Sequence, residues 1–371
     1  MTAQTPPSVV GAAANDPVRF RRSLTARLAG AAIAHPGLLL RLLGQRRPRW
    51  AEGVRLHPSF QLLLALAERS GTRNVTRDWA ADRAQLRTVS RLALPVPVDV
   101  HVVNRRIPGP DGDLPVRVYR SYGARGVVPG IVYLHGGGFA NGDLDTHDTA
   151  CRALAVRSRC VVVAVDYRLA PEHRFPAAVD DATAAWSWVV DHADELVINP
   201  AALGVMGDSA GGTLSAVVCL EARRLGLRPP ALQCLLYPLV DARLTTAGFA
   251  TFADGWGLTT AEVEALLVNY APDPADWDDP RVSPLRAADH SDLPPAFIVT
   301  AGFDVLCDEG PAYADALRAA GGEARHVRIV DMVHGFHTMS AVPDANAVAA
   351  AIDSEVGRRL WATASTTPDG A

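Results

Sequence analysis

Cysteine is scarce in this sequence, and no pattern links the few cysteines that it has. They are widely spaced and lie mostly in apolar runs, at Cys151, Cys160, Cys219, Cys234 and Cys307. An odd number of cysteines without a CxxC pair argues against a disulfide framework and against a zinc site. We therefore expect buried free thiols, no metal site and a cytoplasmic protein in a reducing compartment.

The chain also lacks an excess of either charge and any long apolar run. Its 36 basic and 40 acidic residues give a net charge of −4, so no nucleic-acid partner is expected. The apolar stretch 28–34 is too short for a membrane span. Arg27 interrupts the apolar run at its start, which argues against a secretory signal. We expect an amphipathic helical pair here, whose basic segment could make a weak, peripheral contact with a membrane surface through Arg19, Arg21, Arg22, Arg27, Arg41, Arg46, Arg47 and Arg49.

Apolar segments and amphipathic segments alternate through the rest of the chain. The spacing predicts strands over 130–134, 160–165, 203–206, 232–236, 297–300 and 326–330. It predicts helices over 147–157, 177–192, 210–225, 310–320 and 344–360, and an earlier helix over 56–68. Solid apolar strands separated by helices indicate an α/β fold with a mostly parallel sheet covered on both faces. Before them, alternation over 98–102 and 116–119 around a turn-rich segment at 107–113 predicts an antiparallel hairpin.

One serine stands in a turn between a predicted strand and a predicted helix. The pattern is G-x-S-x-G, made by Gly207, Asp208, Ser209, Ala210 and Gly211. Small residues on both sides allow a sharp, strained turn that exposes the serine hydroxyl, and the N–H of Ala210 would point at a developing negative charge. The alternative is that Ser209 only caps the helix.

Three consecutive glycines follow the predicted strand 130–134, within the run His135 to Phe139. Glycine lets backbone N–H groups approach a ligand closely, so this loop is a candidate oxyanion hole. A flexible turn is the alternative. A phosphate loop is disfavoured because no G-x-x-x-x-G-K-[ST] pattern occurs.

Two further candidates follow later strands. Asp304 comes just after the strand 297–300, too early to decorate the next helix as Asp308 does. His334 follows the strand 326–330, with His337 as its nearest competitor. The chain order Ser209, Asp304, His334 is the order expected of α/β-hydrolases.

Five motifs in this order resemble the hormone-sensitive-lipase-like esterases, the bacterial family IV carboxylesterases of the α/β-hydrolase superfamily. The resemblance runs from about residue 96 to the C-terminus, and its motifs are HGGGF at 135–139, DYRLAPEHRFPAA at 166–178, GDSAGG at 207–212, DVLCDEG at 304–310 and HGF at 334–336. It implies an α/β-hydrolase fold with a mostly parallel central sheet flanked by helices. Cys307 departs from the family, which more often has Arg or another polar residue there.

The resemblance also implies roles for individual residues. Ser209 would be the nucleophile, His334 the general base and then acid, and Asp304 the group that orients the imidazole. The oxyanion hole would draw on backbone N–H groups of Gly136, Gly137, Gly138 and Ala210.

A helical cap and a buried scaffold are further implications of the resemblance. We expect residues 1–95 to form an N-terminal extension and cap, and residues 96–371 a catalytic domain with a cap insertion at about 241–292. Thr259 to Glu262 has a capping-box pattern that predicts a helix in the insertion. Asp166, Arg168 and Glu172 are expected to be buried polar packing beneath the site.

The resulting hypothesis is a cofactor-independent serine carboxylesterase that acts on short to medium acyl esters through an acyl-enzyme intermediate. A deacetylase or amidase with the same triad is one alternative. A non-catalytic small-molecule receptor of the same fold is another, but such a receptor predicts loss of the histidine, and His334 is present. The sequence leaves open the physiological ester and the choice between a monomer and a homodimer.

Overall fold

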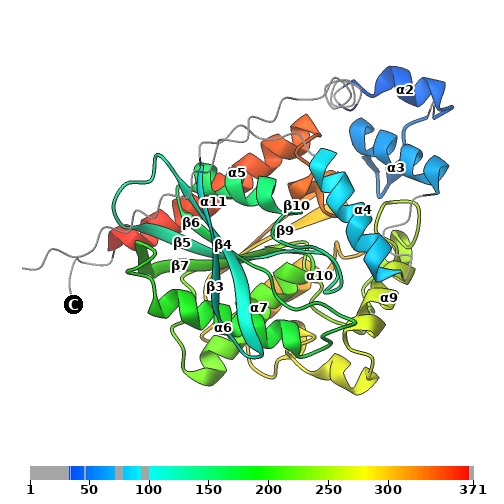
Figure 1. The fold of residues 1–371 in the computed structure, drawn as a ribbon. Helices are drawn as coiled ribbons and strands as arrows, with labels where there is room; N and C mark the ends of the chain where they lie inside the picture. The colour runs from blue at the N-terminus through cyan, green and yellow to red at the C-terminus, as the bar shows by residue number, and fades with distance from the viewer. Residues whose placement is uncertain (1–32, 34, 46, 72–77, 93–99, 367–371) are drawn as a thin grey trace, which may run out of the picture.

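The core of the molecule is a sheet of eight strands. The computed structural model describes residues 33, 35–45, 47–71, 78–92 and 100–366 (Figure 1). Within them the strand order is β10-β9-β8-β7-β5-β6-β4-β3. The strands are β3 (Val100–Gly109), β4 (Gly112–Ser121), β5 (Val128–Leu134), β6 (Val161–Val165), β7 (Ile198–Asp208), β8 (Gln233–Leu236), β9 (Ala296–Phe303) and β10 (Ala324–Val333).

Strands β5 to β10 run parallel to one another, as the apolar segments predict. Strands β5, β6, β8 and β9 are buried along their whole length, because helices cover both faces of the sheet. The mostly parallel central sheet flanked by helices is confirmed. The hairpin of β3 and β4 is antiparallel, but its turn is tighter than predicted, because pairing continues to Gly109 and Gly112.

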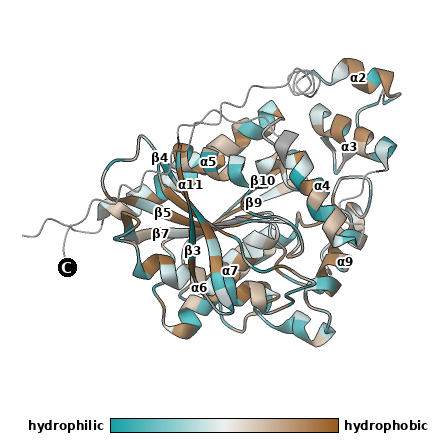
Figure 2. Cartoon of the chain, viewed as in Figure 1, coloured by the Kyte–Doolittle hydropathy of each residue, from teal (hydrophilic) through white to brown (hydrophobic). Residues whose placement is uncertain are grey.

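Helices lie in two layers against the sheet (Figure 1). One face carries α5 (Asp148–Ser158) and α11 (Pro343–Thr366), and the other carries α6 (Ala177–Asp191), α7 (Ala210–Leu225) and α10 (Glu309–Ala319). Figure 2 shows hydrophobic residues concentrated in the strands between these layers. Each face therefore has its own apolar core, one centred on Trp186 of α6 and the other including Val356 and Leu360 of α11.

The N-terminal elements gather on the side of the molecule where α9 lies (Figure 1). They are α2 (Gly37–Leu42), the short pair β1 (Trp50–Ala51) and β2 (Val54–Arg55), α3 (Pro58–Ser70) and α4 (Trp79–Leu92). The region predicted as an insertion holds α8 (Gly248–Thr251), α9 (Thr260–Tyr270) and the 3₁₀ turns η1 (Pro274–Asp278) and η2 (Pro284–Arg286). A further turn, η3 (Phe336–Thr338), follows β10. Arg49 donates from Nη1 to the Gly255 carbonyl at 2.9 Å, which joins the two groups of elements.

Two local predictions for these elements are confirmed. Helix α3 begins at the Pro58-Ser59 signal, with Pro58 in its first turn. Helix α9 has the predicted capping box, because Thr259 accepts from the N–H of Glu262 and the Glu262 side chain accepts from the N–H of Thr259. Helix α4 and the pair of β1 and β2 have no counterpart among the predictions.

The predicted N-terminal helical pair falls largely outside the described residues, as do the apolar stretch 28–32 and Arg19, Arg21, Arg22, Arg27 and Arg46. The described part of it is Ile33 and α2. Across the portion of the chain that the structure describes, each helix is too short or too polar to cross a lipid bilayer.

Candidate active site

Four loops with the candidate residues meet at one edge of the sheet. Ser209 follows β7 directly, Asp304 follows β9, and His334 follows β10. The loop with the three glycines, residues 135–142, follows β5. Because these strands are parallel, their carboxyl ends lie at the same edge, where open α/β sheets bind ligands.

The backbone at Ser209 is strained, as the sequence pattern predicts. Its φ is 54° and its ψ is −121°, in a region that residues other than glycine rarely adopt. A Cβ atom on Gly211 would overlap the Leu134 carbonyl, and one on Gly207 would overlap Gly211 itself. Glycine on both sides therefore lets β7 turn sharply into α7, with Ser209 at the helix N-terminus.

Ser209, His334 and Asp304 form a continuous chain of hydrogen bonds. His334 Nε2 lies 2.9 Å from Ser209 Oγ, and His334 Nδ1 lies 2.7 Å from Asp304 Oδ2. Asp304 is buried, and its other oxygen accepts from the N–H of Leu306 at 3.0 Å. A carboxylate at Nδ1 holds the proton on that nitrogen and leaves the Nε2 lone pair facing the serine hydroxyl.

The competing residues from the sequence have other partners. His337 Nε2 lies 2.8 Å from Asp353 and is buried. Asp308 accepts from the N–H of Gly248 at 2.8 Å and so holds the start of α8. The structure thus brings Asp304 and His334 to Ser209 and places Asp308 and His337 in separate contacts.

The glycines of the 135–142 loop differ in what their N–H groups face. Gly136 donates to Asp208 Oδ1 at 3.0 Å, so its N–H is already engaged. Among the hydrogen bonds of the described residues, the N–H groups of Gly137, Gly138 and Ala210 have no protein acceptor. Gly137 and Gly138 have φ of +121° and +62°, which glycine adopts without steric cost. The 135–142 loop therefore offers two unpaired donors and the start of α7 offers a third, whereas donation from Gly136 to an oxyanion stays a prediction.

Asp208, the variable residue of the G-x-S-x-G pattern, is a buried anchor for this loop. It accepts from Tyr133 Oη at 2.7 Å and lies 3.5 Å from His147 Nε2. Burial alone would raise the pKa of this carboxyl, but the His147 ring and the Tyr133 hydroxyl hold it well below its ordinary value. Asp208 thus stays ionised and can fix Gly136, a role that its position between Gly207 and the nucleophile candidate could have suggested.

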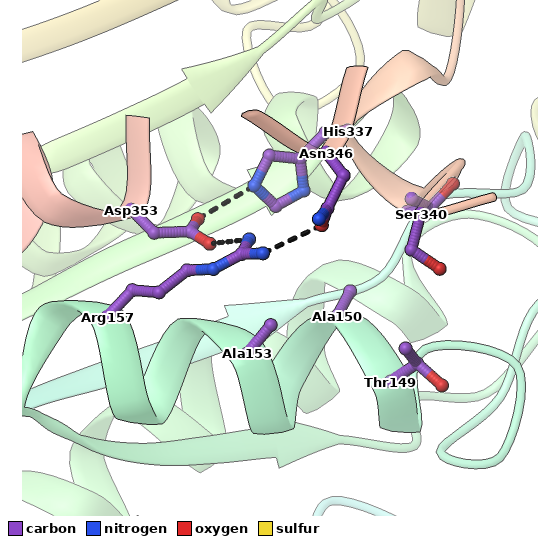
Figure 3. Close-up of a pocket in the computed structure, with 9 residues that line it drawn as sticks. Thr149, Ala150, Ala153, Arg157, His337, Ser340, Asn346 and Asp353 are labelled. Atoms are coloured by element: carbon purple, nitrogen blue, oxygen red, sulfur yellow. Dashed lines mark hydrogen bonds and ion pairs between the residues drawn. The ribbon is translucent and has the colours of Figure 1, made fainter. Parts of the chain in front are cut away.

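A second polar network connects the histidine loop, residues 334–338, to α5 and α11 (Figure 3). Asp353 of α11 lies 2.8 Å from His337 Nε2 and accepts from Arg157 Nη1 at 3.0 Å. Arg157 of α5 also donates to Asn346 at 2.7 Å. These contacts tie η3, which directly follows His334, to the two helices on that face of the sheet. No sequence motif indicates this network, since its members lie far apart in the chain.

The segment 166–178 is only partly the buried packing that was predicted. Arg168 donates to Asp181 from Nη2 at 2.8 Å and from its backbone N–H at 2.9 Å. Burial raises the pKa of Asp166 to about 6. The prediction for Glu172 is wrong, because its carboxylate is 56% exposed and pairs with Arg83 of α4 at the surface.

The five cysteines are all buried free thiols, which confirms that prediction. Burial raises the pKa of the Cys307 thiol to about 12, so little thiolate forms at neutral pH. In the part of the chain that the structure describes, His, Cys, Asp and Glu side chains form no group of three that could hold a metal ion.

Comparisons with known proteins agree with this geometry. Residues 131–338 match the profile of a family described by its alpha/beta hydrolase fold. The carboxylic ester hydrolase LipN of Mycobacterium tuberculosis is 44% identical over 305 residues, which are 80% of this chain and 81% of LipN. The ethyl acetate hydrolase of Pseudomonas putida is 40% identical over 232 residues, which are 62% of this chain and 73% of that enzyme. A solved structure of a serine-to-alanine variant of LAE6, an alpha/beta hydrolase enzyme from the metagenome of Lake Arreo, Spain, matches with a TM-score of 0.78 and 39% identity, covering 84% of this chain and 99% of that one.

Proposed function

The chain belongs to the α/β-hydrolase family, in its hormone-sensitive-lipase-like branch of carboxylic ester hydrolases, and on this premise we propose that Ser209, His334 and Asp304 hydrolyse short to medium acyl esters. The observation that carries the proposal is the hydrogen-bonded chain from Ser209 Oγ through His334 to Asp304, with distances of 2.9 and 2.7 Å. Nucleophile, base and orienting carboxylate are thus within reach of one another before any substrate binds.

The reaction would proceed through an acyl-enzyme intermediate. Ser209 Oγ attacks the ester carbonyl carbon while its proton passes to His334 Nε2, and the carbonyl oxygen becomes an oxyanion. The imidazolium, stabilised by Asp304, then protonates the departing alkoxide. A water molecule attacks the acyl-serine in the same way, and the acid is released with Ser209 restored.

The N–H groups of Gly137, Gly138 and Ala210 would stabilise the two oxyanions. Their lack of protein acceptors supports this role. Each donor in such a site contributes about 2.7–4 kcal/mol to transition-state stabilisation. Gly136 would act indirectly, because Asp208 holds its N–H and thereby fixes the loop.

A limited acyl length is supported by the residue that covers this loop. A Cβ atom on Gly138 would lie 2.5 Å from a terminal carbon of Leu266, so this side chain of α9 packs directly on the loop. The proposed cap therefore restricts the space beside the reacting carbonyl. Similarity to an ethyl acetate hydrolase also favours short esters.

The test is hydrolysis of p-nitrophenyl esters from acetate to palmitate by the wild type and by Ser209→Ala. We expect kcat/KM to be highest for acyl chains of short to medium length, and we expect turnover to fall by several orders of magnitude in the variant. A preference for palmitate would contradict the proposed substrate size. Retained activity in Ser209→Ala would contradict the nucleophile.

We further propose a cytoplasmic location, because five buried free thiols are typical of a reducing compartment. The basic N-terminal segment would add a weak contact with anionic lipid. Cell fractionation tests the first point. Sedimentation with phosphatidylglycerol vesicles, by the full chain and by a chain without residues 1–32, tests the second.

A further inference from the structure

Arg83 connects helix α4 of the N-terminal region to the 135–142 loop by a hydrogen bond. Arg83 Nε donates to the Ala140 carbonyl at 2.7 Å, and Nη2 donates to the Ala170 carbonyl at 2.8 Å. Arg83 also donates to the Glu172 carboxylate, from Nη1 to Oε1 at 3.0 Å and from Nη2 to Oε2 at 2.8 Å. One side chain thus bonds to two loops beside the site and to a surface acid.

The Ala140 and Ala170 carbonyls lie in two loops that are hydrogen-bonded to each other, and Ala140 also closes the turn that contains Gly137 and Gly138. Ala170 donates its N–H to the Phe139 carbonyl at 2.9 Å, so the two loops are already joined there. The Gly137 carbonyl accepts from the N–H of Ala140 at 3.2 Å and from that of Asn141 at 2.9 Å. Arg83 therefore donates to the last residue, Ala140, of the same tight turn that begins with Gly137 and Gly138.

The contact is partly shielded from solvent, unlike most surface arginine pairs. The Arg83 side chain is 22% exposed, and Ala140 and Ala170 are buried. Among the hydrogen bonds of the described residues, Arg83 supplies the donors to both carbonyls. Removing it would leave two buried acceptors unsatisfied, which favours a shift of the loop toward other donors.

Arg87 lies one helical turn further along α4 and makes a second contact between this helix and the segment after β5. It donates to Asp143 at 2.6 Å, and Asp143 also accepts from the N–H groups of Asp145 and Thr146. Residues four apart lie on one face of a helix, so this face of α4 is directed at the segment that follows β5. The Arg87 side chain is 54% exposed, so its ion pair contributes less.

We propose that Arg83 is a positioning residue that couples α4 to the oxyanion hole. The inference rests on the proposed function, because it assigns the oxyanion to Gly137 and Gly138. Arg83 does not touch the substrate. It holds the loop at the far end of the turn, so that a displacement of α4 changes the direction of the N–H donors and hence the rate of the chemical step.

The experiment compares Arg83→Ala, Arg83→Lys and Glu172→Gln with the wild type on p-nitrophenyl acetate. Glu172→Gln is the matched control, since it removes the surface charge pair and leaves both carbonyl bonds in place. Loss of one oxyanion donor lowers kcat by roughly 10²–10³-fold, and here the donors are displaced rather than removed. We expect kcat to fall about 10–100-fold in Arg83→Ala, with KM within about threefold of the wild-type value.

A second readout separates positioning from stability. A trifluoromethyl ketone forms a tetrahedral adduct with the nucleophile and needs the oxyanion hole, so its Ki should rise in parallel with the loss in kcat/KM. Arg83→Lys should lie between Arg83→Ala and the wild type, because an ammonium group lacks the planar fork that spans both carbonyls. Glu172→Gln should keep kcat within about twofold, as expected for an exposed pair.

Three results would overturn the proposal. The first is that Arg83→Ala or Arg83→Lys keeps the wild-type kcat and the wild-type Ki of the ketone. The second is that the Arg83 variants change only KM or only the melting temperature. The third is that Glu172→Gln loses as much kcat as Arg83→Ala does. If Arg83→Ala does not fold, Arg83→Lys carries the test. Failure of the proposed function is a separate result, since it would appear as an inactive wild type, whereas failure of this inference leaves the wild type active.

Discussion

At the scale of single residues, the proposed site combines Ser209 and His334, which stand in short motifs, with Arg83, whose contacts are distant in the chain. Ser209 and His334 stand out because strand-end position and neighbouring glycines are local features. Arg83 does not stand out, because its partners Ala140 and Ala170 lie 57 and 87 residues away along the chain. A long-range hydrogen bond to a backbone carbonyl leaves no pattern in one sequence.

Asp304 and Asp308 provide a matched pair for testing the orienting carboxylate. Asp304→Asn keeps the shape of the side chain but favours the wrong imidazole tautomer, so we expect kcat to fall by about 10⁴-fold. Asp308→Asn keeps an oxygen that can accept from Gly248 and should retain most activity. Steady-state kinetics on p-nitrophenyl acetate measure both variants. An inactive Asp308→Asn beside an active Asp304→Asn would reverse the assignment.

Glu309, at the start of α10, should make the stability of the fold depend on pH. It is buried, accepts from the N–H groups of Val240 and Asp241 at 3.0 and 2.9 Å, and has its pKa raised by burial from 4.5 to about 7. Because the folded state holds this proton more tightly than the unfolded state, its contribution is complete below pH 4.5 and is lost as pH rises to about 7.

Glu309→Gln should remove this dependence. Between pH 4.5 and 8 the free energy of unfolding of the wild type should fall relative to the variant, by up to about 3 kcal/mol for a pKa shift of this size. Urea unfolding at a series of pH values gives the difference. Curves for the two proteins that stay parallel across this window would contradict the prediction.

At the scale of elements, the sheet and helix α3 were predictable, whereas helix α4 of the N-terminal region was not. A strand such as β6 is buried on both faces, so it appears as an unbroken apolar run that ends at the charged Asp166. Helix α4 carries many polar residues, and it contacts the loops beside the site through Arg83 and Arg87. These contacts reach residues far away in the chain, so no periodicity in one sequence reveals where α4 packs.

Helix α9 should set the acyl-chain preference through Leu266. Shortening this side chain opens space against Gly138, so Leu266→Ala should raise the ratio of kcat/KM for octanoate over acetate by about tenfold. Val268 lies on the same helix and is 51% exposed, so Val268→Ala is the control and should leave the ratio unchanged. The p-nitrophenyl ester series measures both ratios. An equal shift in both variants would mean that α9 acts through its stability and not through Leu266.

At the scale of the whole molecule, contacts distant in sequence hold the site loops on the sheet. The four loops come from strands spread between residues 128 and 333, and their relative positions depend on the helices that cover the sheet. On one face this support includes a buried charge cluster, Arg157, Asp353 and His337 (Figure 3). Such a cluster is specified by the fold as a whole, which explains why motif analysis does not reveal it.

Removing the Asp353 carboxylate should destabilise the fold far more than removing a surface acid of the same helix. Asp353→Asn leaves the partly buried Arg157 without its charged partner, and breaking a buried ion pair costs about 3–5 kcal/mol. The control is Asp344→Asn, also in α11, whose carboxylate is 72% exposed and pairs with His57, so it should cost less than about 1 kcal/mol. Urea unfolding at pH 7 measures both. If the two variants lose equal stability, the cluster does not hold η3 and the histidine loop against the helices, and their position must depend on the apolar packing of Phe336 instead.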